Sequence, residues 1–153
     1  MRDDELARTL DEQRWKFPIS SLPAADQAAR GLPPVTGADV AATYGLLVHY
    51  TQWQYLVLMM QDREIRARCW LTPTAYAECM VPYNLGLDSP REVCLLVDVS
   101  SLPILWGPGV TPPSARNPSI WRGGGIEFYS PHPIPFSCVT EVIELAPCGD
   151  EHP

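Results

Sequence analysis

The sequence contains no apolar run close to the ~20 residues that a membrane-spanning helix requires. Its start, MRDDELARTLDEQ, lacks the basic and apolar regions of a secretory signal peptide, so we expect a cytoplasmic protein with no membrane partner. No segment repeats. These absences leave a chain of 153 residues, which is long enough for one domain with its own hydrophobic core.

Basic residues are also scarce, since 11 Lys and Arg stand against 18 Asp and Glu, for a net charge of −7. The second half is the more acidic, because residues 76–153 hold three basic and nine acidic groups. Such a chain is poorly suited to unspecific binding of a phosphate backbone, which relies on clustered cations. The densest strip is Arg63, Arg66 and Arg68, which could contact nucleic acid or form a solvated strand face.

Paired cysteine spacings are missing as well. The five cysteines follow no C-x-x-C pattern, and three histidines add few further ligands, so we expect no metal site. We interpret the cysteines as reduced thiols that act as small hydrophobic residues. They are Cys69, Cys79, Cys94, Cys138 and Cys148.

What is present favours a single α+β domain over residues 1–153, because 17 prolines exclude a helical bundle. Residues 1–43 read as an arm, with an amphipathic helix at 3–15 and a loop-rich stretch at 18–38. Residues 44–145 form the predicted core, built on antiparallel sheet.

Five segments of this core have strand-like patterns. They are YGLLVHYT (44–51), REIRARCWLT (63–72), REVCLLVDVS (91–100), GGIEFYS (124–130) and SCVTEVIEL (137–145). In the last of these, Val139, Val142 and Ile143 are the expected core residues.

Two helices and a loop complete the prediction. QWQYLVLMMQD (52–62) reads as a helix that buries Trp53, Leu56, Val57 and Met60. A second helix starts at Thr72-Pro73 and ends near Asn84-Leu85-Gly86. Residues 105–125 have no regular pattern and are predicted to form a long loop.

The first candidate for chemistry is His49-Tyr50-Thr51, at the end of a buried strand. Residues i and i+2 of a strand share a face, so His49 and Thr51 can present an imidazole and a hydroxyl around the backbone of Tyr50. This set of donors and acceptors suits a ribose hydroxyl and a carboxamide. The alternative is a strand-end histidine bonded to backbone, with a threonine that caps the next helix.

The second candidate is Glu127 in GGGIEFY, between Ile126 and Phe128. A carboxylate on an apolar strand costs free energy unless it is solvated, paired or used, and the preceding glycines allow close approach. A solvent-facing glutamate on an amphipathic strand is the other interpretation. A third candidate is a set of aromatic residues that could stack on a heterocycle or fill a small core: Tyr76, Tyr83, Trp106, Trp121 and Tyr129.

Taken together, HYT at a strand end, an apolar helix, a strand ending in LTP, and GGIEFYSPHPIPFSCVTEVIEL resemble the ADP-ribosyltransferase superfamily over residues 44–145. The similarity is to its His-Tyr-Glu branch, which includes poly-ADP-ribose polymerases and DarT-type toxins. The resemblance implies split antiparallel sheets around an NAD-binding cleft, with the ends of 45–50 and 125–129 facing each other.

Carried onto this chain, the resemblance gives His49 the ribose and Thr51 the carboxamide of NAD, and makes Glu127 the catalytic carboxylate. The tyrosine that stacks on nicotinamide is Tyr83 or Tyr76. Because some toxin branches use an aspartate, Asp98 in LLVDVSSLP is a further candidate.

The implied function is a toxin-like transferase that cleaves the nicotinamide–ribose bond of NAD and passes ADP-ribose to a protein or nucleic acid. The loop 107–124 would govern the acceptor through Arg116, Trp121 and Arg122, which can grip an anion or stack a base. An antitoxin protein is a further expected partner. Two alternatives remain, namely an NAD glycohydrolase with water as acceptor and a non-catalytic, antitoxin-type binding module.

Overall fold

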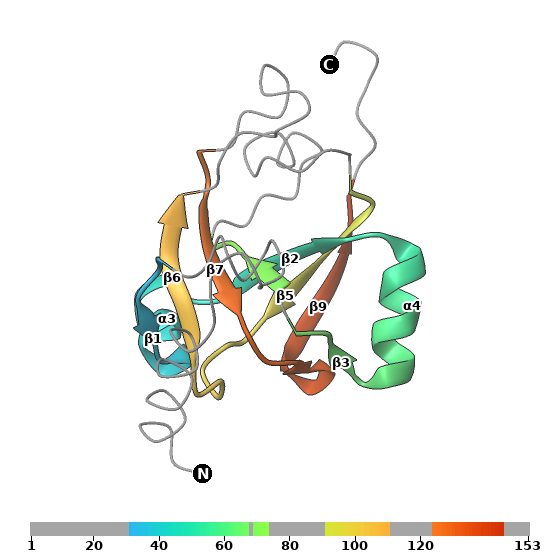
Figure 1. Ribbon diagram of the computed structural model, residues 1–153. Coiled ribbons are helices and arrows are strands. Elements are labelled where there is room, and N and C mark those ends of the chain that lie inside the picture. Colours follow the sequence, from blue (N-terminus) through green and yellow to red (C-terminus); the bar gives the residue numbers. More distant parts are fainter. Residues whose placement is uncertain (1–30, 68, 74–90, 111–123, 146–153) are drawn as a thin grey trace, which may run out of the picture.

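The computed structural model describes residues 31–67, 69–73, 91–110 and 124–145, and these ranges form an α+β fold built on antiparallel sheets (Figure 1). The sequence predicted this class. The helices are α3 (Gly37–Tyr44), α4 (Trp53–Asp62) and the short 3-10 helix η2 (Phe136–Cys138). The strands are β1 (Pro34–Val35), β2 (Leu47–Thr51), β3 (Glu64–Ile65), β4 (Cys69–Leu71), β5 (Val93–Val97), β6 (Leu105–Val110), β7 (Ile126–Ser130), β8 (Ile134–Pro135) and β9 (Val139–Glu144).

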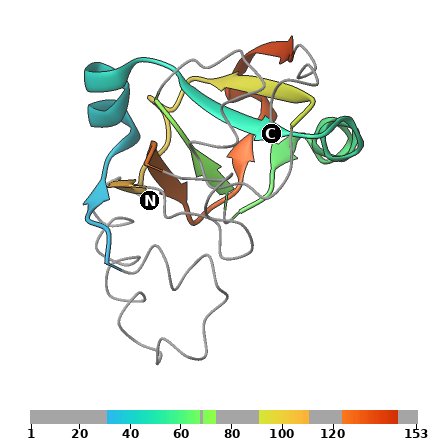
Figure 2. The ribbon, with the colours of Figure 1, turned by 90° about the horizontal axis from the view of Figure 1, so that it is seen from above.

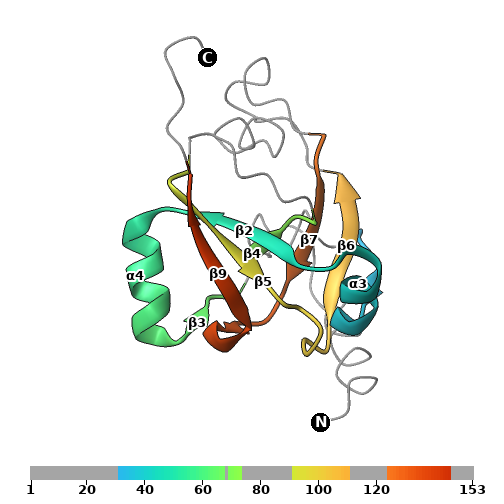
Figure 3. The same cartoon turned by 180° about the vertical axis from the view of Figure 1, so that it is seen from behind.

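The described strands form three sheets in which every pairing is antiparallel. The first sheet has the order β1-β6-β7-β4, the second β2-β5-β9, and the third pairs β3 with β8. In the front and the back view, α4 lies at one edge of the molecule, and β6 and α3 lie at the opposite edge (Figures 1 and 3). From above, α4 is viewed end-on beside the strands (Figure 2).

Among the described residues, one isolated backbone pairing joins the first two sheets. Val48 of β2 pairs with Thr72, the residue after β4, through backbone hydrogen bonds of 2.8 and 2.9 Å. The ladder does not continue beyond this isolated pair. β4 therefore has β7 as its neighbour on one side and touches β2 on the other, where the two sheets separate.

The main hydrophobic core lies between these sheets and takes side chains from both. Side chains alternate between the two faces of each strand. One face of each strand points into this core, and it carries Leu47 on β2, Leu71 on β4 and Phe128 on β7. The opposite face of β4 and β7 carries Trp70 and Tyr129, which pack in a smaller cluster with Ile104 and Trp106.

Two of the five predicted strands need correction. REIRARCWLT is two strands, because β3 pairs with β8 while β4 pairs with β7 in another sheet. In SCVTEVIEL, Val139 and Ile143 pack against buried residues as predicted, but Val142 is exposed. The predicted strands 44–51, 91–100 and 124–130 are confirmed as β2, β5 and β7, each shorter than its sequence pattern.

The predicted buried side of α4 is largely wrong. Leu56 is its one buried residue, and Met59 packs partly against the core. Trp53, Val57 and Met60 are exposed. Because α4 lies at the side of the sheets and packs chiefly on β3, only a narrow strip of it meets the core.

β6 was predicted to be loop, and the reason for the error is local. Gly107-Pro108 interrupts the apolar pattern of the sequence. In the structure the register of β6 against β7 shifts between Trp106 and Gly109. The two residues therefore lie in a local irregularity of the strand pairing, and the strand continues on both sides of it. Gly107 has φ of 148°, and a Cβ there would lie 2.7 Å from the ring of Phe128. Glycine therefore lets the strand pass closely over β7.

α3 lies in the segment that the sequence analysis assigned to an arm, and it was missed. Its signals are nevertheless present, because Thr36 Oγ1 accepts the backbone N–H of Asp39 and Gly45 ends the helix with φ of 76°. The N–H of Gly37 donates to the carbonyl of Leu102 at 2.9 Å, and Val40 is buried in the main core. This part of the predicted arm thus belongs to the folded body.

The predicted helix 3–15 and most of the predicted helix 72–86 lie outside the described residues. Cys69, Cys94 and Cys138 form no disulfide, and Cys79 and Cys148 lie outside the described ranges. Within those ranges, no helix has the length and apolar character needed to cross a bilayer.

Candidate functional site

The end of β2 places the His49-Tyr50-Thr51 motif beside the point where the two sheets separate. His49 and Thr51 share the face of β2 that carries Leu47, as strand alternation requires, whereas Tyr50 packs on the other face with Val48 and Cys94. Thr51 and Tyr50 are buried, and His49 is half-buried. The pairing of β2 with β5 holds all three in register, with His49 opposite Leu95.

The imidazole of His49 bonds to backbone at this separation. Its Nδ1 lies 3.0 Å from the carbonyl oxygen of Trp70 in β4. A carbonyl only accepts, so Nδ1 carries the hydrogen and, in the neutral ring, Nε2 is left as an acceptor. Burial lowers the pKa of His49, the Trp70 hydrogen bond opposes that shift, and the charge of Arg91 adds to it. The ring is thus neutral at pH 7, and its Nε2 can accept a hydrogen bond from a hydroxyl group.

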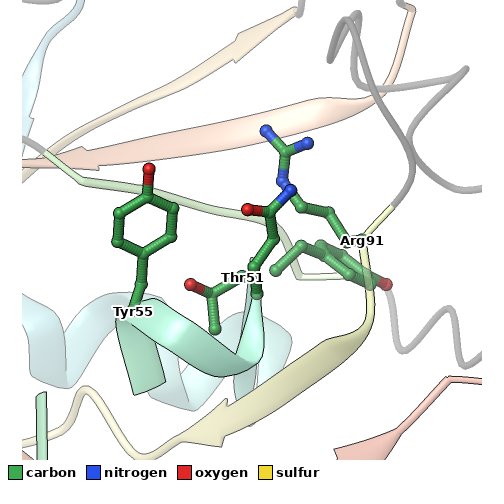
Figure 4. A pocket seen from close by; sticks show the side chains of 5 residues that line it. Thr51, Tyr55 and Arg91 are labelled. Atoms are coloured by element: carbon green, nitrogen blue, oxygen red, sulfur yellow. The ribbon is translucent and has the colours of Figure 1, made fainter. Parts of the chain in front are cut away.

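A polar hollow of about 350 Å³ opens where β2 ends and α4 begins. It is lined by Tyr50, Thr51, Gln52, Tyr55 and Arg91. Figure 4 shows Thr51 between Tyr55 and Arg91, whose side chains rise on either side of it. Hydroxyl, amide and guanidinium groups together suit a polar ligand that carries negative charge.

Glu127 lies on β7, opposite Gly109 of β6. Its side chain is half-buried, and burial raises the pKa of this carboxyl to about 7. The shift has no contribution from a neighbouring charge among the described residues. The half-burial of Glu127 favours the first interpretation over a fully solvent-facing glutamate. A carboxyl that changes charge near pH 7 is a candidate for chemistry.

The structure brings the strands of His49 and Glu127 near one another, but neither residue lines the hollow. β2 and β7 lie on opposite sides of β4, about 10 Å apart at the usual strand spacing. Glu127 is on the face of β7 that carries Tyr129, and His49 is on the face of β2 that carries Leu47. A ligand must therefore reach across the junction of β2 and β4 to touch both.

Thr72 is at the centre of this junction, where it pairs with Val48; the sequence marked it only as a helix start and not as a site residue. It is buried, and among the described residues its Oγ1 has no hydrogen-bond partner. Thr72 directly follows Leu71, and Glu127 directly precedes the Phe128 that pairs with Leu71. The buried hydroxyl of Thr72 and the half-buried carboxyl of Glu127 thus belong to the same end of the β4–β7 pair.

Gln52, Tyr55 and Arg91 were also missed as lining residues. Gln52 and Tyr55 could have been suspected, because they follow the HYT motif within the first turn of the helix. Arg91 could not, since it reaches the hollow only because Val93 pairs with Thr51.

The other aromatic and acidic candidates have structural surroundings. Tyr129 and Trp106 are buried and their rings pack at 5.6 Å, so they fill a core. Asp98 follows the end of β5 remote from Arg91, and its Oδ1 accepts the N–H of Ser100 at 3.0 Å. Hydrogen bonding to Ser100 lowers the pKa of Asp98, as expected for a carboxylate that stabilises a turn.

The remaining site candidates lie outside the described residues. They are Tyr76, Tyr83, Arg116, Trp121 and Arg122. In the described ranges no three His, Cys, Asp or Glu side chains are grouped as metal ligands would be.

Comparison with known proteins adds no relative. A scan against models of protein families finds no match, and searches of the curated proteins and of the solved structures find no significant match.

Proposed function

We propose that the chain is a cytoplasmic ADP-ribosyltransferase of the His-Tyr-Glu type, which cleaves NAD and passes ADP-ribose to a macromolecule. One observation carries the proposal. A half-buried glutamate with a raised pKa lies on β7, next to the strand β4 that also meets the strand bearing His49-Tyr50-Thr51. The separation of the two sheets beside β4 supports a split arrangement, whereas His49 and Glu127 lie on faces that belong to different clusters and do not face each other directly as the motifs implied.

In this proposal β2 holds the nicotinamide end of NAD. The neutral His49 ring offers Nε2 to a ribose hydroxyl, because its Nδ1 is held by the Trp70 carbonyl. Thr51 and the backbone beside it take the carboxamide. The polar hollow takes a charged part of the dinucleotide, since Arg91 can pair with a diphosphate oxygen.

Glu127 acts on the reacting carbon. The bond between that anomeric carbon and the nicotinamide nitrogen breaks, and neutral nicotinamide leaves with the electron pair. The carboxylate stabilises the positive charge that develops on the ribose. An acceptor hydroxyl, amine or carboxylate then bonds to the carbon, and Glu127 takes its proton where it has one. Only the ionised form can do this, so activity needs Glu127 above its pKa of about 7.

The acceptor is tested with the full chain and NAD labelled in its adenylate half. Separate incubations receive protein, DNA or RNA from a cell extract, and the label in each macromolecule is counted. Transfer that Glu127→Gln abolishes and Glu141→Gln retains supports the proposal; Glu141 is an exposed glutamate on β9 and serves as the matched control. Release of free ADP-ribose alone identifies an NAD glycohydrolase. If no incubation yields either product, the chain is not an enzyme of this type, and the non-catalytic binding module is the remaining interpretation.

A further inference from the structure

Thr72 and Glu127 face each other at the end of the β4–β7 pair. The last paired residues there are Leu71 and Phe128. Thr72 is the next residue on the first chain segment, and Glu127 is the preceding residue on the second, so the two occupy opposite positions of an antiparallel pair. Pro73 follows Thr72 and has no N–H with which to continue the ladder.

The backbone hydrogen bonds show which kind of position this is. The N–H and the carbonyl of Thr72 both bond to Val48 of β2, so they point away from β7. Glu127 pairs with Gly109 of β6, on the far side of β7 from β4. Thr72 and Glu127 therefore face each other with no backbone hydrogen bond between them. At such positions the Cα atoms approach to about 4.5 Å and the side chains are closest.

A pair of the same kind lies two residues along and shows how close the side chains come. Trp70 faces Tyr129, and their ring centroids are 4.8 Å apart. The carbonyl of Trp70 is turned away from β7, where it bonds to His49. Because side chains alternate along a strand, Thr72 and Glu127 share the face of these two rings. The polar pair is thus the next neighbour of a closely packed aromatic pair.

Both polar groups lack the partner that burial calls for. Thr72 is 2% exposed, and its Oγ1 has no hydrogen-bond partner in the described part of the chain. Glu127 is half-buried, and burial alone raises the pKa of its carboxyl, with no contribution from a hydrogen bond or a charge there. Each unpartnered group costs free energy. A hydroxyl donates and a carboxylate accepts, so each group can satisfy the other.

We propose that the hydroxyl of Thr72 donates a hydrogen bond to the ionised carboxylate of Glu127 and holds that carboxylate in place. The bond forms on ionisation, because a charged carboxylate is a stronger acceptor than a carboxylic acid. A long side chain reaches the residue directly opposite it without movement of the backbone. Thr72 is then a positioning residue, and this role rests on the proposed function, whereas the bond itself does not.

Few other groups can affect the titration of Glu127. In the described ranges Gly109 faces it from β6 and Thr72 from β4, and neither of these strands carries a charged side chain. Tyr129 is the titratable neighbour on the same face of β7, and Cys69 of β4 lies on the opposite face, in the main core. Comparison with Glu127→Gln separates the titration of Glu127 from that of both neighbours.

Carbon NMR of the full chain with labelled glutamate follows the carboxyl of Glu127 directly and needs no NAD. Thr72→Val removes the hydroxyl and keeps the shape, so the pKa of Glu127 should rise by about 1, the effect of one lost hydrogen bond to a charged group. Thr72→Ser keeps the hydroxyl and should stay close to wild type. The matched control is Thr140→Val, at an exposed threonine of β9, which should change nothing. Equal pKa values in wild type and Thr72→Val would overturn the proposal.

Urea unfolding separates the bond from a purely structural hydroxyl. The difference in free energy of unfolding, Thr72→Val minus wild type, should be more negative at pH 8, where Glu127 is ionised, than at pH 5. A structural hydroxyl would give the same difference at both values and would overturn the bond.

Nicotinamide release tests the positioning role. Thr72→Val should move the midpoint of the pH–rate profile upward by the same amount as the pKa of Glu127. Release with an unmoved midpoint would overturn the positioning role. A raised pKa in a chain that releases no nicotinamide would overturn the proposed function, while the bond would stand.

Discussion

At the scale of single residues, the two central candidates differ in what burial does to them. Burial keeps His49 neutral, which suits a residue that binds by hydrogen bonds. Burial also keeps Glu127 partly protonated at pH 7, which is costly for a residue with only a structural role. The sequence predicted both as candidates, but it could not show the Trp70 carbonyl that fixes the ring of His49, because Trp70 is distant in sequence.

The raised pKa of Glu127 predicts a pH dependence of folding. The carboxyl has a pKa of about 7 in the folded chain against 4.5 when unfolded, so the folded state binds more protons between these values. The free energy of unfolding should therefore decrease as pH rises from about 4.5 to about 7, and this loss persists above pH 7. Glu127→Gln should lack this part of the decrease.

Urea unfolding of wild type and Glu127→Gln at pH 5 and at pH 8 measures the effect. We expect the difference in free energy of unfolding, Glu127→Gln minus wild type, to be more positive at pH 8 than at pH 5. Glu141→Gln, on the exposed edge of β9, should show no such gain. Parallel pH profiles for wild type and Glu127→Gln would mean that Glu127 is solvated.

His49→Ala is expected to act on NAD affinity. Removal of a ligand hydrogen bond costs about 0.5–1.5 kcal/mol, so the dissociation constant should rise roughly three- to tenfold. Isothermal titration calorimetry measures it, with Glu141→Gln as the control, since Glu141 is exposed on β9 and does not line the hollow. Unchanged affinity in His49→Ala would remove this residue from the binding site.

At the scale of elements, local pattern predicted the strands that alternate cleanly and failed where packing decides. β2, β5 and β7 were found because buried strands have recognisable apolar runs. The face of α4 was wrong because its sequence is apolar nearly all round, so periodicity alone could not select Leu56. β6 was missed because Gly107-Pro108 resembles a turn until its irregular pairing with β7 is known.

The start of α3 provides a stability test at this scale. A Cβ on Gly37 would lie 2.0 Å from the carbonyl oxygen of Val99 and 2.5 Å from that of Leu102. Gly37→Ala must therefore displace α3 from the segment that it packs on, at a cost of about 1–3 kcal/mol in the free energy of unfolding. Urea unfolding measures this cost. Gly31→Ala is the control, because a Cβ there meets nothing within 4 Å. Equal stabilities would show that α3 is not held at Gly37.

At the scale of the whole molecule, the site depends on pairings that no local pattern reveals. β4 pairs with β7 although nearly sixty residues separate them in sequence, and an isolated backbone pairing and the His49–Trp70 hydrogen bond link β4 to β2. The order β6-β7-β4 beside β2-β5-β9 is what brings the strand of Glu127 near that of His49. The sequence predicted the class of fold and the residue types of the site, whereas Thr72 and Arg91 enter only through this arrangement.

The most direct test of the central claim is the release of nicotinamide from NAD by the purified full chain, followed by chromatography. We predict that wild type releases nicotinamide, that Glu127→Gln lowers the rate by about 10²–10³-fold, and that Glu141→Gln leaves it unchanged. The rate should also rise as pH increases through about 7, where Glu127 ionises. No release by wild type with protein, DNA, RNA or water as acceptor, or an undiminished rate in Glu127→Gln, would contradict the account.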